Sequence, residues 1–221
     1  MRVESIQVGL PRTPGRPGAT SAAEREWTTA LYKETITAPV QVGTEGLDGD
    51  GQADLENHGG PDMAINAYPR EHLAHWRETL ALPFEPGAFG ENFSTSGLAE
   101  TGTCIGDRFR VGSALVEVSQ PRQPCWKIAR RWQVKDLALR VGRTGFSGWY
   151  FRVLEKGEIE APEALELLDR PYPEWTIAAV NELRFRRTDD GKAALRLSRC
   201  PALSTTWREI FQSRASELGF G

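Results

Sequence analysis

Residues 106–125, with the sequence GDRFRVGSALVEVSQPRQPC, decide the fold that this chain is predicted to adopt. Phe109 and Val111 alternate with arginines, and after a Gly-Ser pair apolar residues again recur at every second position. This period of two around a two-residue turn indicates a β-hairpin with one buried face. Two prolines then interrupt the second strand, because proline cannot donate a backbone hydrogen bond, and Cys125 follows them.

Short segments of the same kind on both sides of the hairpin predict further strands, at Val3–Val8, Glu34–Val42 and Gly148–Leu154. Helical spacing of apolar residues predicts two helices, over Arg70–Leu82, which Pro83 ends, and over Trp126–Leu139. The 22 glycines and 14 prolines favour a turn-rich β architecture over a helical bundle.

The pattern changes after Gly157. We expect four short helices in this part of the chain. The first begins at Pro162-Glu163-Ala164-Leu165, and the second follows Thr176, which can cap it. The third covers Ala193–Leu197, and the last begins at a capping-box pair of Thr206 and Glu209. The fold class is therefore β-rich, mainly β with α. It divides into a β domain over residues 1–161 and a small helical bundle over residues 162–221, which we expect to dock on the first domain because so small a bundle has little core of its own.

Composition excludes several classes of protein. The 221 residues are 39% hydrophobic and 26% charged, which is enough to bury a core and argues against disorder. The net charge of −3 does not fit a protein that coats nucleic acid. No apolar run approaches the roughly 18 residues that a membrane span needs. The N-terminus, MRVESI, has an early acid and no apolar signal segment, so we expect a cytoplasmic protein that binds neither nucleic acid nor membrane.

Cys125 has the most unusual surroundings of the three cysteines. The segment from Gln120 to Arg143 holds seven basic residues against one acid, a local charge of +6. Basic neighbours and a helix N-terminus both favour a thiolate, which is a nucleophile and a soft metal ligand. A buried cysteine that acts as a small apolar side chain also fits, and from the residues alone that role is the commoner one. We expect it for Cys104 and Cys200, and with no CxxC pattern we predict no disulfide framework or structural zinc site.

Two polar loops supply further candidates. His58-Gly59-Gly60-Pro61-Asp62 lets the backbone approach a ligand closely, and His58 could contact a phosphate, bind a metal with Asp62, or only bond a turn carbonyl. Asn92, after Gly90-Glu91, could orient a ligand or cap a turn. An acidic run at Asp48, Asp50 and Asp54 fails as a calcium loop because Ala53 replaces the turn glycine. His72 and His75 are interpreted as solvated helix residues.

Several stretches in one order resemble a known family. They are Gly46–Asp54 (GLDGDGQAD), His58–Asp62 (HGGPD), Phe89–Phe93 (FGENF), Ile105–Asp107 (IGD) and Gln120–Cys125 (QPRQPC). Together they are similar to the MOSC domain, and more narrowly to its YiiM-like branch, over about residues 1–160. The segments Tyr172–Thr176 (YPEWT) and Leu203–Arg208 (LSTTWR) resemble the three-helix segment that follows this domain in that branch.

The resemblance implies a MOSC-type β-barrel, similar to the pyruvate-kinase barrel, over residues 1–161 and a three-helix domain over residues 162–221. It also implies handling of the molybdenum cofactor (molybdopterin), with Cys125 as the catalytic, molybdenum-bearing or sulfur-bearing residue. Arg122 suits an anionic phosphate because its planar guanidinium group can donate hydrogen bonds to two phosphate oxygens at once. The residues expected to bind the cofactor are Arg122, Gln120, Lys127, His58, Gly59, Gly60, Asp62 and Asn92.

Two functions remain open at this stage. The first is a molybdenum-dependent oxidoreductase that reduces small N-hydroxylated compounds, such as N-hydroxylated bases, in a detoxification role. No flavin or iron–sulfur motif occurs in the sequence, so its electrons would come from a partner reductase protein. The second is a carrier without turnover, which holds the cofactor or passes sulfur to it as a Cys125 persulfide. A homodimer is left open as the assembly.

Overall fold

The hairpin predicted over residues 106–119 is present in the computed structural model, which describes residues 1–21, 24–55 and 59–221. Strand β7 (Arg108–Val111) pairs antiparallel with β8 (Ala114–Pro121), with Phe109 opposite Val116 and Val111 opposite Ala114. These four side chains are fully buried. The two-residue turn between the strands begins at Gly112, whose φ of +53° is left-handed.

The hairpin belongs to a strongly curved sheet. In the described residues this sheet follows the order β11-β1-β6-β5-β9-β8-β7-β12, with β2 paired to β1 off that path. Its other strands are β1 (Arg2–Val8), β2 (Glu34–Ile36), β5 (Ile65–Pro69), β6 (Phe93–Ser96), β9 (Trp149–Glu155), β11 (Glu163–Ala164) and β12 (Glu166–Asp169). The two end strands, β11 and β12, are separated in the chain by Leu165 alone, so the sheet curls until its ends meet.

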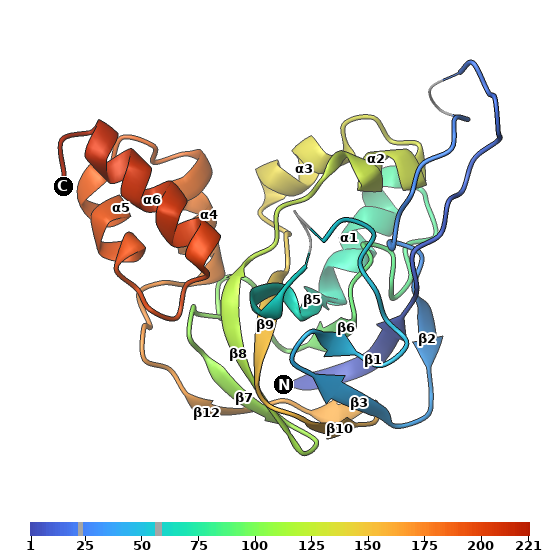
Figure 1. Ribbon diagram of the computed structural model, residues 1–221, viewed down its shortest axis with the longest axis horizontal. Coiled ribbons are helices and arrows are strands. Elements are labelled where there is room, and N and C mark those ends of the chain that lie inside the picture. Colours follow the sequence, from blue (N-terminus) through green and yellow to red (C-terminus); the bar gives the residue numbers. More distant parts are fainter. Residues whose placement is uncertain (22–23, 56–58) are drawn as a thin grey trace.

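A smaller sheet, β10-β3-β4, lies beside this barrel and is made of β3 (Val40–Gly43), β4 (Gly46–Leu47) and β10 (Gly157–Ile159). Figure 1 shows the barrel with helices above it and a separate group of helices to one side. The predicted β-rich barrel followed by a helical segment is therefore confirmed.

Three sequence predictions are wrong in detail. The expected strand over 34–42 is two strands, β2 and β3, with Pro39 between them. Residues 162–165 do not start a helix. Strand β11 pairs with β1 and β12 pairs with β7, so long-range pairing outweighs the local pattern. The expected helix over 126–139 is divided into α2 (Trp126–Trp132) and α3 (Leu137–Thr144), because Gln133 takes a left-handed φ of +55° that ends α2.

Helices α1 (Glu71–Leu80), α2 and α3 cover one end of the barrel. They surround a second apolar cluster that contains Tyr68, Trp76, Phe84 and Phe89. His72 was expected in solvent, but it is only 8% exposed, lies 2.7 Å from a Glu100 carboxylate oxygen and stacks on Phe146. That interpretation is therefore wrong for His72, because the contacts that bury it come from segments distant in the sequence.

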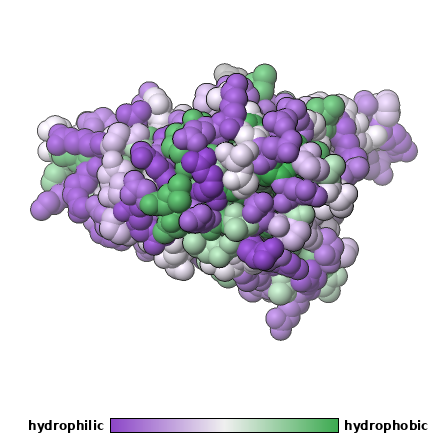
Figure 2. All heavy atoms as spheres, turned by 90° about the horizontal axis from the view of Figure 1, so that it is seen from below, coloured by the Kyte–Doolittle hydropathy of each residue, from purple (hydrophilic) through white to green (hydrophobic). Residues whose placement is uncertain are grey.

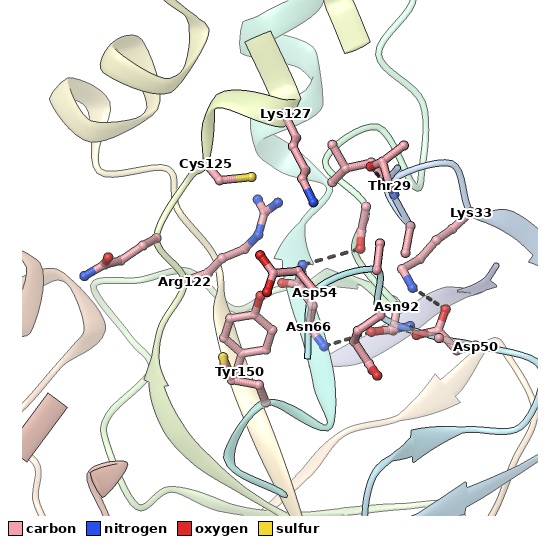
Figure 3. Close-up of a pocket in the computed structure, with 18 residues that line it drawn as sticks. Thr29, Lys33, Asp50, Asp54, Asn66, Asn92, Arg122, Cys125, Lys127 and Tyr150 are labelled. Carbon is pink, nitrogen blue, oxygen red and sulfur yellow. Dashed lines mark hydrogen bonds and ion pairs between the residues drawn. The ribbon is translucent and has the colours of Figure 1, made fainter. Parts of the chain in front are cut away.

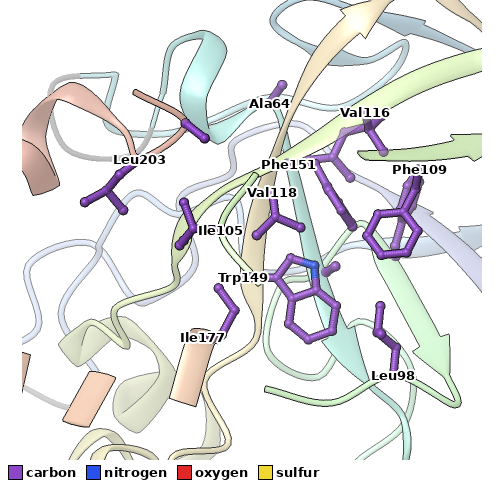
Figure 4. Close-up of a cluster of buried hydrophobic side chains, with 14 of the residues drawn as sticks. Ala64, Leu98, Ile105, Phe109, Val116, Val118, Trp149, Phe151, Ile177 and Leu203 are labelled. Atoms are coloured by element: carbon purple, nitrogen blue, oxygen red, sulfur yellow. The ribbon is translucent and has the colours of Figure 1, made fainter. Parts of the chain in front are cut away.

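The C-terminal helices share the core of the barrel. They are α4 (Ile177–Phe185), α5 (Gly191–Ser198) and α6 (Thr205–Glu217). Figure 4 shows Ile177 and Leu203 beside the barrel residues Ile105 and Val118, and all four belong to one buried cluster. Thr176 caps α4 as predicted, whereas α6 is capped by Ser204 rather than Thr206, because the Ser204 hydroxyl accepts from the Trp207 N–H.

Backbone hydrogen bonds add to this packing between barrel and helices. The Ser204 N–H donates to the Ser119 carbonyl of β8 over 3.0 Å, and the Ile177 N–H donates to the Thr103 carbonyl over 2.8 Å. The helical segment is thus docked on the barrel. The division of the chain at residue 161 stays a prediction.

Within the described ranges, none of the helices has the length and hydrophobicity required to span a bilayer. Seen from below, the molecule is largely hydrophilic, with apolar side chains gathered in limited patches (Figure 2).

Gly148 provides a test of how tightly the barrel is closed next to β8. Its φ is +70°, and a Cβ atom there would lie 2.3 Å from the Ala67 carbonyl oxygen. We expect Gly148→Ala to lower the free energy of unfolding by at least about 1–2 kcal/mol, the cost of a left-handed non-glycine residue, in urea denaturation. Gly142→Ala is the matched control, because Gly142 lies in a helix with nothing within 4 Å of the added methyl. It should stabilise the protein by up to about 1 kcal/mol. Equal effects of the two changes would contradict this account.

Candidate functional site

A cavity lies where β8 ends and the chain turns into α2. It holds roughly 620 Å³ of empty space that is open to solvent. Its walls come from residues 29–33, from the Gly-rich loop before η1 (Pro61–Met63), from β5 and β9, from Gly90 and Asn92 before β6, and from the segment 122–127 that leads into α2. We call it the cleft, and its lining residues are Thr29, Ala30, Leu31, Lys33, Asp50, Gly51, Gln52, Ala53, Asp54, Met63, Asn66, Gly90, Asn92, Arg122, Gln123, Cys125, Lys127 and Tyr150.

Cys125 lies at the wall of the cleft. It immediately precedes α2, is half-buried and forms no disulfide. Figure 3 shows its thiol, the Arg122 guanidinium and the Lys127 ammonium directed into the same space. Two cations beside one accessible sulfur favour an anionic species there, whether a thiolate or an anionic ligand of the cleft.

Arg122 is the cation that the fold holds most firmly. Its side chain is 4% exposed, and its Nη2 donates to the Phe89 carbonyl over 2.6 Å. Its backbone N–H donates to the Gly148 carbonyl over 3.1 Å. Among the described residues, the buried Nη1 has no hydrogen-bond partner. Since buried polar atoms are nearly always partnered, this atom at the wall of the cleft marks a place for an acceptor from a ligand.

A buried ion pair supports the opposite side of the cleft. The Lys33 ammonium pairs with Asp50, and their side chains are 6% and 2% exposed. Asp50 also accepts from the Gly9 N–H over 2.9 Å and from the Asn92 amide over 2.8 Å. Burial lowers the pKa of Lys33, and the neighbouring Asp50 carboxylate opposes that shift. Asn92 therefore orients the carboxylate that pairs with Lys33.

Tyr150 of β9 lies close to Cys125 and Arg122 at the cleft wall (Figure 3). Burial raises the pKa of its hydroxyl. The positive charge of Arg122 and a hydrogen bond with the Arg122 side chain lower that pKa, and a charge on Cys125 raises it. The hydroxyl therefore keeps its proton at neutral pH. Asp54, from the acidic run, lines the cleft beside it.

A second cavity meets the cleft at Cys125. It holds roughly 1120 Å³ of empty space that is open to solvent, and it extends along the start of α6. We call it the α6 groove. Its lining residues are Asp54, Met63, Gln120, Gln123, Pro124, Cys125, Trp126, Lys127, Tyr150, Thr206, Trp207 and Ile210.

The structure brings together only part of the predicted site. Cys125, Arg122, Lys127 and Asn92 all line the cleft, whereas Gln120 lines the α6 groove. Gly59, Gly60 and Asp62 are not among the described residues that line either cavity. His58 lies outside the described residues. The cofactor contacts predicted for these four residues stay predictions.

Asp62 has a clear structural role instead. Its Oδ1 accepts from Arg152 over 2.8 Å, and its Oδ2 accepts from the Thr205 N–H over 3.4 Å. Asp62 therefore connects the barrel to the first residue of α6.

The charge of +6 over residues 120–143 is not concentrated at the cleft. Of its seven basic residues, only Arg122 and Lys127 are among the described residues that line it. Arg131 donates to the carbonyls of Leu31 and Gly87, and Arg130 donates to the carbonyl of Arg25. The lining itself has three cations, Lys33, Arg122 and Lys127, against the two carboxylates of Asp50 and Asp54. The excess of positive charge is thus local and small.

Sequence reasoning missed several lining residues. Lys33 lies in a segment with no distinctive pattern, and Tyr150 was recognised only as one position of an alternating strand. Asp50 and Asp54 were considered only as calcium ligands, although the Gly-rich run that contains them was part of the resemblance. The glycine content of that run was the signal that could have located them.

The three cysteines lie in different environments. Cys104 and Cys200 are both buried, as predicted; Cys200 belongs to the core cluster shared by the barrel and the C-terminal helices, whereas the Cys104 thiol donates to the Pro173 carbonyl over 3.6 Å. Burial raises the pKa of both thiols. Cys125 borders both cavities, so the packing alternative left open by the sequence does not describe it.

Comparison with known proteins agrees with the geometry. The model of the MOSC domain matches residues 54–166, and that of the YiiM-like 3-alpha helix domain matches residues 175–216. The uncharacterized protein YflK of Bacillus subtilis is 40% identical over 216 residues, which are 98% of this chain and 95% of YflK. The crystal structure of YiiM from Geobacillus stearothermophilus superposes with a TM-score of 0.81 at 40% identity, covering 97% of this chain and 98% of that one.

A third similar protein is longer. A Gibberella moniliformis protein named "Reductase" is 38% identical over 162 residues, which are 72% of this chain but 29% of that protein.

The reactivity of the thiols tests whether Cys125 is accessible at the wall of the cleft. We expect iodoacetamide at neutral pH to alkylate Cys125 at least about tenfold faster than Cys104 or Cys200, because burial and a raised pKa leave those two with little reactive thiolate. Mass spectrometry of peptides over time gives the three rates. In denaturant the three rates should converge, and equal rates in the folded protein would mean that Cys125 is as protected as the other two.

The Lys33–Asp50 pair predicts a large effect on stability. We expect Asp50→Ala to lower the free energy of unfolding by about 3–5 kcal/mol, because it leaves a buried ammonium without its partner. Glu174→Ala is the matched control, since its pair with Arg196 is exposed and should contribute less than about 1 kcal/mol. Urea denaturation of both variants measures the difference, and an Asp50→Ala effect no larger than the control would refute a structural role for the pair.

Proposed function

The chain belongs to the MOSC domain family, and we propose that it binds the molybdenum cofactor in the cleft and reduces N-hydroxylated compounds with electrons from a separate reductase. The observation that carries this proposal is the unpartnered, buried Nη1 of Arg122 at the same cavity as the Cys125 thiol and the Lys127 ammonium.

The cationic side of the cleft fits the anionic part of this cofactor. Arg122 is anchored through Nη2, so its Nη1 can donate a hydrogen bond to a ligand oxygen without any change of position. Lys127 adds a second cation on the same wall. A pre-positioned guanidinium suits a phosphate because little side-chain entropy is lost on binding.

Cys125 also fits the role of a sulfur ligand to the molybdenum of this cofactor. Among residues 1–21, 24–55 and 59–221, no three His, Cys, Asp or Glu side chains come together as a metal-binding group. Cys125 therefore suits a metal whose other ligands arrive with the cofactor, and a thiolate is a soft ligand of the kind that molybdenum accepts. When bound, the cofactor supplies a redox-active metal and two dithiolene sulfurs.

The other lining residues of the cleft then have definite tasks. The Lys33–Asp50–Asn92 network holds the wall opposite Cys125 in one arrangement. Tyr150 keeps its proton at neutral pH, because burial raises its pKa, so it can donate a hydrogen bond to a ligand beside Cys125. Because the Arg122 side chain is buried, it keeps its position and can fix the orientation of a bound anion.

One relative supports reduction as the reaction. The Gibberella moniliformis protein that shares 38% identity with this chain is named "Reductase", and the similar region is 29% of its length. Since the 221 residues contain no flavin or iron–sulfur motif, we propose that electrons reach the cleft from a separate reductase protein. The small N-hydroxylated substrate is likewise part of the proposal.

Substitution of Cys125 tests the proposal directly. We expect Cys125→Ser to abolish reduction of an N-hydroxylated base by the cofactor-loaded protein supplied with a reductase, because a hydroxyl is a hard, protonated group near neutral pH. The melting temperature should change little, since the site is half-buried and polar. A thiol in an apolar core would instead cost about 1–3 kcal/mol on replacement by an unpaired hydroxyl.

Cys104→Ser is the matched control for that experiment. It should lower the melting temperature while leaving reduction intact, because Cys104 is buried away from both cavities. Full activity of Cys125→Ser would exclude Cys125 from the chemistry. Cofactor bound by the wild-type protein without any turnover, with a competent reductase present, would instead support a carrier of the cofactor or of a Cys125 persulfide.

A further inference from the structure

The arm between β1 and β2 stands beside α2 at the end of the barrel that the helices cover (Figure 1). The Arg130 guanidinium donates to the Arg25 carbonyl of this arm, and Arg131 donates to the Leu31 carbonyl. Two segments distant in the sequence thus form one surface. We call it the basic face, and it consists of residues 10–21, 24–32 and 123–135. Both segments also supply lining residues of the cleft, so the basic face borders that cavity.

The basic face carries a charge opposite to that of the remainder of the chain. Its acidic residues are Glu24 and Glu26 alone, whereas seven of its residues are basic, which gives a net charge of +5. The whole chain has a net charge of −3, so all other residues together carry −8. Such an asymmetry attracts an acidic partner and turns this face toward it before contact. The seven basic residues are Arg12, Arg16, Arg25, Lys127, Arg130, Arg131 and Lys135.

Most of these cations are not neutralised by a carboxylate. Of the seven, Arg16 alone forms an ion pair with another described residue, Glu24. Arg12 and Arg131 lie over opposite contacts of one aromatic ring, with their guanidinium carbons 4.0 and 4.9 Å from the Tyr32 centroid. An aromatic ring holds a guanidinium in place without cancelling its charge. The basic face therefore presents ordered cations to the carboxylates of a partner.

An exposed tryptophan adds an apolar contact among these cations. Trp126 directly follows Cys125 in the chain, and its side chain is 57% exposed. Its ring centroid lies 5.8 Å from that of Trp27, and the Arg130 guanidinium lies 5.1 Å from the Trp27 centroid. Tryptophan and arginine are the residues that most often dominate the binding energy of protein interfaces. The composition of the face thus suits a protein partner that binds beside the sulfur.

We propose that the basic face docks a small acidic electron-carrier protein and so brings its redox group to the cleft at Cys125. The inference rests on the proposed function, from which it takes the need for an external electron donor. Two electrons and two protons break the N–O bond of the N-hydroxylated compound and leave an amine and water. Each carrier delivers one electron, so two carriers dock in each turnover. NADPH, oxidised to NADP⁺ by the reductase of the carrier, is the source of both electrons.

Direct binding tests the face apart from turnover. Calorimetry at low ionic strength, with and without bound cofactor, uses two acidic carriers as probes, the FMN protein flavodoxin and a plant-type [2Fe–2S] ferredoxin. We expect at least one of them to bind, and to bind more weakly as salt is added, because salt screens the attraction. The carrier that binds identifies its redox group as a flavin or an iron–sulfur cluster.

Substitutions within the face should weaken this binding. Arg25→Glu combined with Lys135→Glu reverses two exposed charges and should raise the dissociation constant at least about tenfold. Trp126→Ala should have an effect of similar size, because it removes the exposed indole. With NADPH and ferredoxin–NADP reductase, the same variants should need more carrier for half-maximal reduction of the N-hydroxylated base. The rate with reduced methyl viologen, a small reductant that needs no docking, should stay unchanged.

Lys156→Glu combined with Lys192→Glu is the matched control. It changes the net charge by the same amount at two exposed residues outside the face, between β9 and β10 and in α5. Carrier binding by this control should equal that of the wild type. Absence of binding to both carriers, or an equal loss of affinity in the control and in the face variants, would overturn the inference.

Failure of this inference is distinguishable from failure of the proposed function. A protein that acquires molybdenum and reduces the N-hydroxylated base with methyl viologen, but binds neither carrier, keeps its function and loses the docking face. A protein that never acquires molybdenum, yet binds a carrier in a manner sensitive to Arg25, Lys135 and Trp126, keeps the docking face and loses the function.

Discussion

The hydrogen bond from the buried Arg122 guanidinium to the Phe89 carbonyl, 2.6 Å long, is the contact on which the candidate site depends. It joins the loop that leaves β8 to the segment between α1 and β6, and the Arg122 N–H adds a bond to Gly148 beside β9. Strand β8 ends at Pro121, so the chain must leave the sheet at this point. The guanidinium is thereby fixed below the surface, and Cys125 follows three residues later at the cavity wall.

Around this anchor, the two parts of the chain make two different environments. The barrel and the helices above it form a cleft with an excess of cations. The groove beside β8 and α6 shares Asp54 and Lys127 with this cleft and adds only uncharged residues to them. Both meet at the same sulfur. A common core that extends from Phe109 in the barrel to Phe211 in α6 makes this arrangement rigid, since neither part could shift without disturbing the other. The helical segment is therefore part of the site and not an appendage.

Much of this organisation could be predicted from sequence. The hairpin, the Thr176 cap and the position of Cys125 all rest on local rules, in which strand alternation, hydroxyl capping and proline decide the outcome within a few residues. The resemblance to the MOSC domain then placed Arg122 and Cys125 at one site. Residues 162–165, Gln133 and His72 were misinterpreted because partners distant in the chain decide their structure. The Lys33–Asp50 pair joins two loops 17 residues apart, and no local pattern announces it.

The measurement that tests the central claim most directly is the molybdenum and pterin content of the protein, purified from a host that makes the cofactor, for the wild type and for Arg122→Met. If the cleft holds the cofactor through the unpartnered Nη1, the wild-type protein carries both in equal amounts. Arg122→Met should lose most of both while the matched exposed change Arg143→Met retains them. A wild-type protein without molybdenum and pterin that also takes up none on reconstitution, or full retention by Arg122→Met, would contradict the account.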